Sequence, residues 1–156
     1  MLNLFNDLRE DFTKILYLYE VKKIEHLKNK IMVKSKYQNV LDLGEALNIQ
    51  DGDVKVEGDR LEIRGTASTQ YDKDRLWDEI KKSGGENPTD IMADIKVADT
   101  SVYARHTVAS GESLSKIAKH YYNDAMKYNA IFEANTDQLK SADVIHPGQE
   151  LVIPNL

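Results

Sequence analysis

Apolar side chains recur at three- and four-residue steps through the first thirty residues of the chain. They are Phe5, Leu8, Phe12, Ile15, Leu16, Tyr19, Ile24, Leu27 and Ile31. This spacing predicts an amphipathic helix over residues 4–31. Such a helix can lie on a membrane surface, but its polar face mixes acidic and basic side chains without the cationic bias of a membrane-binding helix. We therefore expect its apolar stripe to pack against its own domain.

The next part of the chain changes from helical spacing to alternation. A second, shorter helix is predicted over residues 36–50, and its inward positions are Val40, Leu43 and Leu47. Apolar and polar residues then alternate in 54–57 and again in 61–64, which predicts two strands joined by a turn at 58–60. We expect Gly65 to end this hairpin.

A third helix and a third strand follow the hairpin. The helix is predicted over residues 72–82, where Leu76, Trp77 and Ile80 fall on one side, and the run Ser-Gly-Gly at 83–85 stops it. The strand is predicted from the alternation of Ile91, Ala93, Ile95 and Val97. The run Ala98-Asp99-Thr100-Ser101 is typical of a short linker, which we place at residues 99–102.

The last third of the chain, from Tyr103 to Pro154, has a well-defined order of elements. A short strand is followed by a turn at Gly111, two helices, and a Pro147-Gly148 turn into a final strand. These elements predict a small βααβ unit. Their order resembles the LysM module. The resemblance implies binding of N-acetylglucosamine polymers such as peptidoglycan and chitin, and so a binding protein rather than an enzyme.

The central part of the chain resembles a second known family, the BON domain. The residues that carry this resemblance are Val54, Val56, Gly58, Leu61, Ile63 and Gly65, followed by the strand from Ile91 to Val97. A BON-like domain, a short linker and a C-terminal LysM together resemble the small cytoplasmic potassium-binding BON–LysM proteins of bacteria. The opening Leu4-Phe5-Asn6 and the run from Ile131 to Asn135 also resemble that family.

The expected fold class is α+β. We expect an N-terminal helix and BON-like domain over residues 1–98, with helices packed on a small three-stranded sheet. The linker covers residues 99–102, and the βααβ LysM domain covers residues 103–156.

Composition narrows the range of partners. Apolar residues make up 41% of the chain and charged residues 30%, as in ordinary globular proteins. A net charge of −5 argues against nucleic acid, because no basic patch stands out to neutralise phosphates. The chain has no cysteine, which excludes disulfides and thiolate chemistry. Charge interrupts the N-terminal apolar run, so we find neither an export signal nor a membrane anchor and expect a cytoplasmic monomer.

A glycan-binding LysM would present a shallow groove between its first turn and the loop before its last strand. The candidate residues for this groove are Gly111, Glu112, Ser113, Leu114, Asn135, Ile145 and His146. Leu114 and Ile145 could cover an acetyl methyl group, and the polar members could meet the amide.

A structural role is also open for these candidates. Gly111 serves a turn, and Ser113 is a natural N-cap for the helix that follows. Ile145 can fill the core, Asn135 can fix a loop through bonds to the backbone, and His146 can be an exposed loop residue. His106 stands where many LysM units carry an aromatic residue, so we expect a packed ring there.

Two kinds of metal site can be compared. A calcium loop starting at Asp51 fails, because Lys55 and Val56 stand where an oxygen ligand and a glycine are required. The four histidines show no metal-ligand spacing. A potassium cage can be built from backbone carbonyls, which side chains do not reveal. Spare carbonyls are expected at turns and helix ends near the N-terminus and in the BON-like part.

No catalytic motif is present, so we do not expect an enzyme or an organic cofactor. By resemblance, the chain is expected to bind potassium and to respond by drawing its two domains together. One alternative is a peptidoglycan-binding module. Another is a structural LysM protein of a phage-tail-like baseplate.

Overall fold

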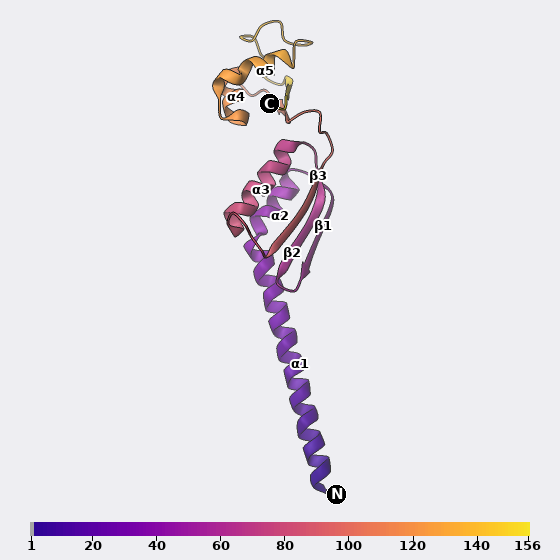
Figure 1. Cartoon of the computed structure of the whole chain (residues 1–156). Coiled ribbons are helices and arrows are strands. Elements are labelled where there is room, and N and C mark those ends of the chain that lie inside the picture. The colour runs from indigo at the N-terminus through magenta and orange to yellow at the C-terminus, as the bar shows by residue number, and fades with distance from the viewer. Residues whose placement is uncertain (1) are drawn as a thin grey trace.

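The computed structural model describes the backbone of residues 2–156 and the side chains of residues 13–156. Figure 1 shows a long helix, a sheet with two helices, and a small C-terminal unit, in that order along one axis. The first six elements are α1 (Leu2–Lys36), α2 (Gln38–Ala46), β1 (Gln50–Glu57), β2 (Arg60–Ala67), α3 (Gln70–Gly84) and β3 (Ile91–Val97). The C-terminal elements are β4 (Ala104–Thr107), α4 (Leu114–Tyr122), the 3₁₀ helix η1 (Ala125–Lys127), α5 (Tyr128–Glu133) and β5 (Glu150–Ile153).

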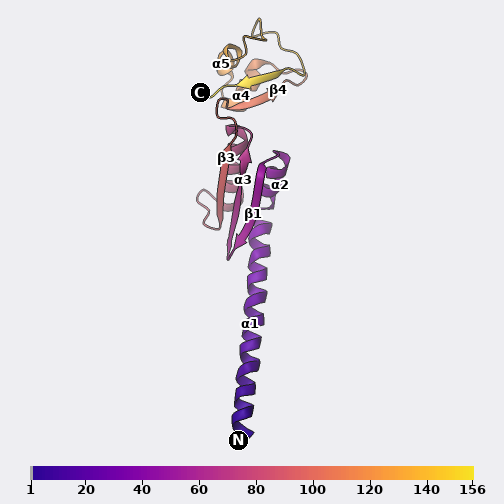
Figure 2. The ribbon, with the colours of Figure 1, turned by 90° about the vertical axis from the view of Figure 1, so that its right-hand side faces the viewer.

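The three-stranded sheet has the order β1-β2-β3. β1 and β2 form an antiparallel hairpin in which Val54 pairs with Ile63. β3 runs parallel to β2, with Leu61 opposite Ile91, so α3 serves as the crossover between them. Figure 2 shows α2 and α3 on one face of this sheet. The buried core between these layers includes Val40, Leu61, Ile63, Leu76, Ile80, Ile91 and Ile95. The expected α+β fold with helices on a three-stranded sheet is therefore confirmed.

Gly65 does not end the hairpin as expected, because β2 continues through it to Ala67. The chain enters β1 through an irregularity between Gln50 and Asp53, and there it passes directly over Gly65. A Cβ on Gly65 would lie 2.5 Å from Ile49 Cγ2 and 3.2 Å from the Gln50 carbonyl oxygen. Glycine is present here because another backbone approaches closely, and not because the strand stops.

The expectation that the first helix packs against its own domain is wrong for most of the described side chains. α1 is longer than predicted and projects away from the sheet (Figure 1). Val33 near its C-terminal end is buried, whereas Ile15, Leu16, Tyr19, Ile24, Leu27 and Ile31 are exposed. The side chains of Phe5, Leu8 and Phe12 lie outside the described residues. No helix among the described residues is both long enough and apolar enough to cross a membrane.

The C-terminal end of α1 is anchored through Tyr37, which separates α1 from α2. Its ring is fully buried, and its hydroxyl donates to Asp90 Oδ1 at 2.5 Å, just before β3. Lys36 Nζ bonds the other oxygen of the same carboxylate. A Cβ on Gly84 would overlap the Tyr37 hydroxyl, so the end of α3 also closes over this residue.

The C-terminal unit is the expected βααβ arrangement. β4 and β5 pair antiparallel, with His106 opposite Leu151. α4 and α5 pack on this two-stranded sheet around a core that includes Leu114, Ile117, Ile131, Leu139 and Leu151.

The close approach at Gly65 generates a prediction about stability. Gly65→Ala should lower the free energy of unfolding by about 1–3 kcal/mol, because the added methyl must displace Ile49 or the β1 backbone. Gly52→Ala is the matched control in the opposing strand, since its Cβ would meet only the Ile49 carbonyl oxygen at 3.9 Å. Urea unfolding measures both. Equal losses in the two variants would contradict the close approach.

Candidate functional site

The first turn of the LysM unit is held by its own side chains. Gly111 has a φ of 79°, in the left-handed region, where glycine is favoured. Ser113 caps α4 by accepting a hydrogen bond from the Lys116 backbone N–H. The Glu112 carboxylate accepts a bond from the Ala109 N–H at 2.7 Å and contacts His106 Nε2 at 2.8 Å. Three of the predicted groove residues thus have structural partners in the turn.

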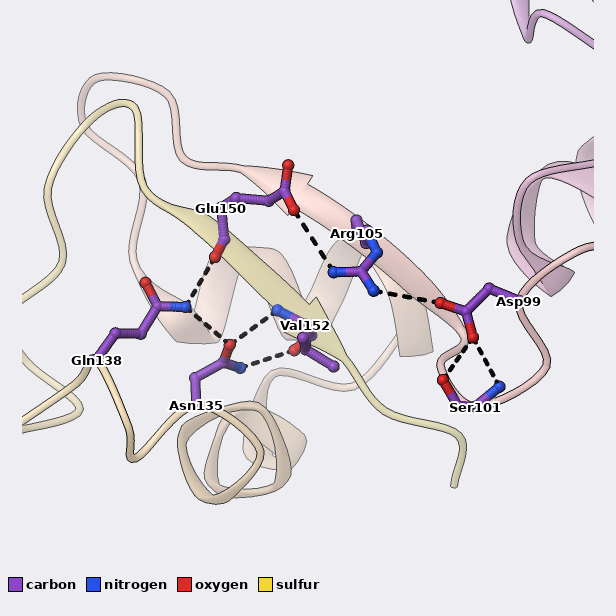
Figure 3. Close-up of polar contacts among 7 residues, drawn as sticks. All are labelled: Asp99, Ser101, Arg105, Asn135, Gln138, Glu150 and Val152. Carbon is purple, nitrogen blue, oxygen red and sulfur yellow. Dashed lines mark hydrogen bonds and ion pairs between the residues drawn. The ribbon is translucent and has the colours of Figure 1, made fainter.

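Asn135 joins the second helix to the last strand (Figure 3). It is only 1% exposed. Its side-chain Nδ2 donates to the carbonyls of Ile131 and Val152, both at 2.7 Å, and its Oδ1 accepts from the Val152 N–H at 2.8 Å. Gln138 Nε2 approaches the same oxygen and also donates to the Glu150 carbonyl. The Asn135 amide therefore bonds the β5 backbone as a neighbouring strand would. This is the structural role predicted for Asn135, in which it fixes a loop through bonds to the backbone.

The remaining groove candidates differ in exposure. Leu114 is 1% exposed and lies in the core, and Ile145 is half-buried against the same core. His146 is exposed, while its backbone N–H donates to Gln149 Oε1 at 2.6 Å. On the described surface, the exposed members of this set are therefore Gly111, Ser113 and His146, while Glu112 and Ile145 are partly exposed. Their role in glycan binding stays a prediction.

His106 is a packed ring, as expected, and it also links two polar side chains. Its Nδ1 lies 3.2 Å from the Tyr121 hydroxyl, and its Nε2 contacts Glu112. The bond from the Ala109 N–H, followed by that of His106, lowers the pKa of the Glu112 carboxyl. Burial raises the pKa of Tyr121 to about 12, so this hydroxyl stays protonated at neutral pH. The spacing of His106, Glu112 and Tyr121 along the sequence did not predict that these side chains are linked.

An aromatic contact joins the sheet domain to the LysM unit. The Tyr71 backbone N–H in α3 donates to the Tyr103 carbonyl at 3.0 Å, and the Tyr71 hydroxyl lies 3.0 Å from His120 Nε2 in α4. The Tyr71 ring also meets the Tyr121 ring edge to face, with centroids 4.7 Å apart. In return, the Tyr103 hydroxyl donates to Asp74 in α3 at 3.3 Å. Sequence reasoning missed this contact because its members are far apart along the chain.

Residues 98–103 between β3 and β4 are also tied down. Asp99 accepts bonds from the Ser101 N–H and hydroxyl, and it pairs with Arg105, which also reaches Glu150 on β5 (Figure 3). The hydrogen bonds that the Ser101 hydroxyl and N–H donate, followed by that of Arg105, lower the pKa of the Asp99 carboxyl. The segment predicted to be a linker is thus attached to the first strand of the LysM unit.

Two kinds of cation site can be sought among the described residues. No group of three or more His, Asp or Glu side chains among them could hold a metal ion. Backbone oxygens offer a different possibility in the loop between α3 and β3. The carbonyls of residues 85–89 accept no hydrogen bond within the described part of the chain. Gly85 has a φ of 86°, which turns the chain out of the helix.

This loop borders a shallow hollow of about 510 Å³ that is lined by Trp77 and residues 86–89 and 91–93. Asp90 closes the loop beside Tyr37 and Lys36. Burial opposes ionisation of Asp90, but the bonds from Lys36 and Tyr37 keep the pKa of its carboxyl below the usual value. The carboxylate is therefore charged at neutral pH, and the Lys36 ammonium beside it offsets that charge.

Comparisons with known proteins agree with this architecture. The LysM domain family model matches residues 106–154. The chain is 38% identical over 109 residues to the potassium binding protein Kbp of Escherichia coli, a match that covers 69% of this chain and 67% of that protein. It is also 35% identical over 116 residues to an uncharacterized protein of Deinococcus radiodurans, covering 65% of this chain and 44% of that protein.

Burial of the Asn135 amide generates a prediction about the LysM unit. Asn135→Ala should lower the free energy of unfolding by about 2–4 kcal/mol, because buried groups of Ile131 and Val152 lose their partners. Asn129→Ala is the control, since Asn129 is exposed on α5, the helix that precedes Asn135. Thermal unfolding measures both variants. A loss confined to glycan binding, without loss of stability, would contradict the structural role.

Proposed function

The chain belongs to the LysM-containing family of the potassium binding protein Kbp, and on this basis we propose that it is a non-enzymatic potassium-binding protein. The observation that carries the proposal is the extent of the similarity. The matched stretch covers 69% of the 156 residues, so it must include residues 60–97 whichever residue it begins at. The likeness to Kbp therefore extends through β2, α3 and β3 and is not a LysM match alone.

The loop after α3 is the best-supported place for the ion. Potassium is coordinated by backbone carbonyl oxygens in channel filters, where they replace its hydration shell. The carbonyls of residues 85–89 are free of hydrogen bonds within the described part of the chain, and Asp90, the next residue, is held by Tyr37 and Lys36. Because Gly85 and Tyr37 hold both ends of the loop, little ordering would be required on binding.

The aromatic contact between α3 and α4 supports a link from ion binding to domain position. α3 carries both Tyr71, which contacts the LysM unit, and Gly85 beyond its C-terminal end. An ion that binds more tightly when this contact is formed would favour the closed arrangement. In the proposed function the chain acts in the cytoplasm as a sensor that reports potassium through this closure.

Trp77 gives this proposal a direct test, because the only tryptophan of the chain lines the same hollow as residues 86–89. Titration with potassium chloride should change Trp77 fluorescence and raise the melting temperature, with sodium chloride at equal ionic strength as the reference. At a concentration one hundred times Kd, the gain in unfolding free energy should be about 2.7 kcal/mol. Identical responses to the two salts would rule out selective binding.

A pair of glycine variants locates the ion. Gly85→Ala should weaken the potassium response, because a left-handed conformation costs alanine about 1–2 kcal/mol and the carbonyls would turn. Gly148→Ala is the matched control, since its φ of 88° is nearly the same and its Cβ also meets nothing within 4 Å. A normal potassium response in Gly85→Ala would move the site away from this loop.

Peptidoglycan binding is the second candidate function, favoured by the LysM match at residues 106–154. The exposed backbone of Gly111 and the exposed His146 lie in the two segments that would border a glycan groove. Glu112, Ser113 and Asn135 would then act by shaping these segments, because their side chains are held by the fold.

Sedimentation with purified peptidoglycan tests this second function. The chain should be retained, and Gly111→Ala should reduce retention because it strains the first turn, which has a φ of 79°. Gly58→Ala is the control with a comparable φ of 60° in the β1–β2 turn of the sheet domain. Absence of the parent protein from the pellet would eliminate glycan binding.

A further inference from the structure

One face of α1 carries apolar side chains that no described part of the molecule covers. Ile24, Leu27 and Ile31 are 53%, 59% and 64% exposed, and Tyr17 is 68% exposed. Since each residue of an α-helix turns by about 100°, these four residues share one face, and the exposed Glu20 falls within the same face. Asn29, which donates to Asp59, and the buried Val33 lie on the opposite side and hold the end of the helix to the sheet domain.

Lysines border this apolar face on both edges. By the same helical geometry, Lys23, Lys30 and Lys34 follow one edge and Lys28 follows the other. Residues 13–36 contain seven lysines and two glutamates, whereas residues 37–156 contain 13 basic and 21 acidic residues. Positive charge is thus concentrated on residues 13–36 of the helix, whereas residues 2–12 hold one basic and three acidic residues, so the acidic and basic mixture noted in the sequence belongs mainly to the start of the helix.

These lysines are free to meet an external partner. Among the residues whose side chains the structure describes, the six lysines from Lys14 to Lys34 have no ion-pair partner, and only Lys36 pairs with Asp90. The helix also carries them away from the acidic domains (Figure 2). Lys14 lies 15 residues before Asn29, or about 22 Å along the helix, which exceeds the screening length of about 8 Å at physiological salt.

The charge pattern disfavours a second copy of the chain as the partner of this face. Ile24, Leu27 and Ile31 have the spacing of a coiled-coil seam, and Lys23, Lys28 and Lys30 then occupy the flanking positions. Pairing two such helices would bring lysines against lysines, and like charges at these positions repel. The complementary surface is apolar in its centre and anionic at its edges.

We propose that α1 lies along an anionic lipid surface, with Tyr17, Ile24, Leu27 and Ile31 in the acyl–headgroup boundary and the lysines on acidic headgroups. An amphipathic helix with lysine-rich edges binds such surfaces through both apolar burial and charge. Tyr17 suits the boundary because its ring is apolar with a polar tip. The helix lies on the surface and does not cross it.

Vesicle co-sedimentation of the full chain tests the proposal. The protein should sediment with vesicles of equimolar phosphatidylcholine and phosphatidylglycerol and stay in solution with phosphatidylcholine alone. The double variant Ile24→Gln and Ile31→Gln should lower the apparent affinity by roughly tenfold or more, because it removes apolar contact with the lipid. Met126→Gln with Val144→Gln is the matched control, since both side chains are exposed in the LysM unit.

A charge variant tests the electrostatic contribution to vesicle binding. Lys28→Glu should weaken binding by about fivefold or more, and added salt should weaken it in the parent protein. Lys140→Glu, at an exposed position of the LysM unit, should bind like the parent. Equal sedimentation with both vesicle types would overturn the proposal. The absence of vesicle binding would overturn it as well. In that case, a dimer seen by sedimentation velocity and lost in the Ile24→Gln and Ile31→Gln double variant would assign the face to a second copy of the chain.

Discussion

The hydrogen bond between Tyr37 and Asp90 is the constraint on which the sheet domain depends most. Tyr37 stands where α1 ends and α2 begins, and Asp90 stands where the α3–β3 loop ends. A fully buried tyrosine requires a partner for its hydroxyl, because an unpaired polar group in the core costs about 1–3 kcal/mol. Supplying that partner brings three segments together: the long helix, the end of α3 and the start of β3.

The bond between Tyr37 and Asp90 also affects which backbone carbonyl oxygens remain without a hydrogen bond. Gly84 must lack a side chain because the Tyr37 ring fills its place, and the chain then turns at Gly85 with its carbonyls unpaired. A loop held at both ends but free of internal bonds is suited to a large, weakly hydrated cation. α3 connects this loop to Tyr71 and so to the LysM unit, which would give the proposed ion binding a physical route to the position of the second domain.

α1 differs from the rest of the chain because most of its described apolar residues are not buried. Only its last turns reach the sheet domain, where Val33 and Tyr37 are buried. Between residues 13 and 32, most of the apolar side chains of the helix are exposed, although burying each would be favourable by about 1.5–3 kcal/mol. A chain that leaves this much apolar surface uncovered, bordered by unpaired lysines, is equipped to bind something beyond itself.

The sequence by itself determined the local elements of this protein. Alternation and helical spacing predicted the hairpin, α3, β3 and the βααβ unit, because neighbouring residues decide which face of an element is apolar. Tertiary structure alone decided what meets each face. Periodicity shows that α1 has an apolar side, yet not that the described part of the fold leaves it uncovered. Spacing likewise could not reveal that Ile49 and Gln50 lie against Gly65, that Asn135 bonds β5, or that Tyr71 meets His120. These contacts join residues far apart in the chain, so only the folded backbone brings them within bonding distance.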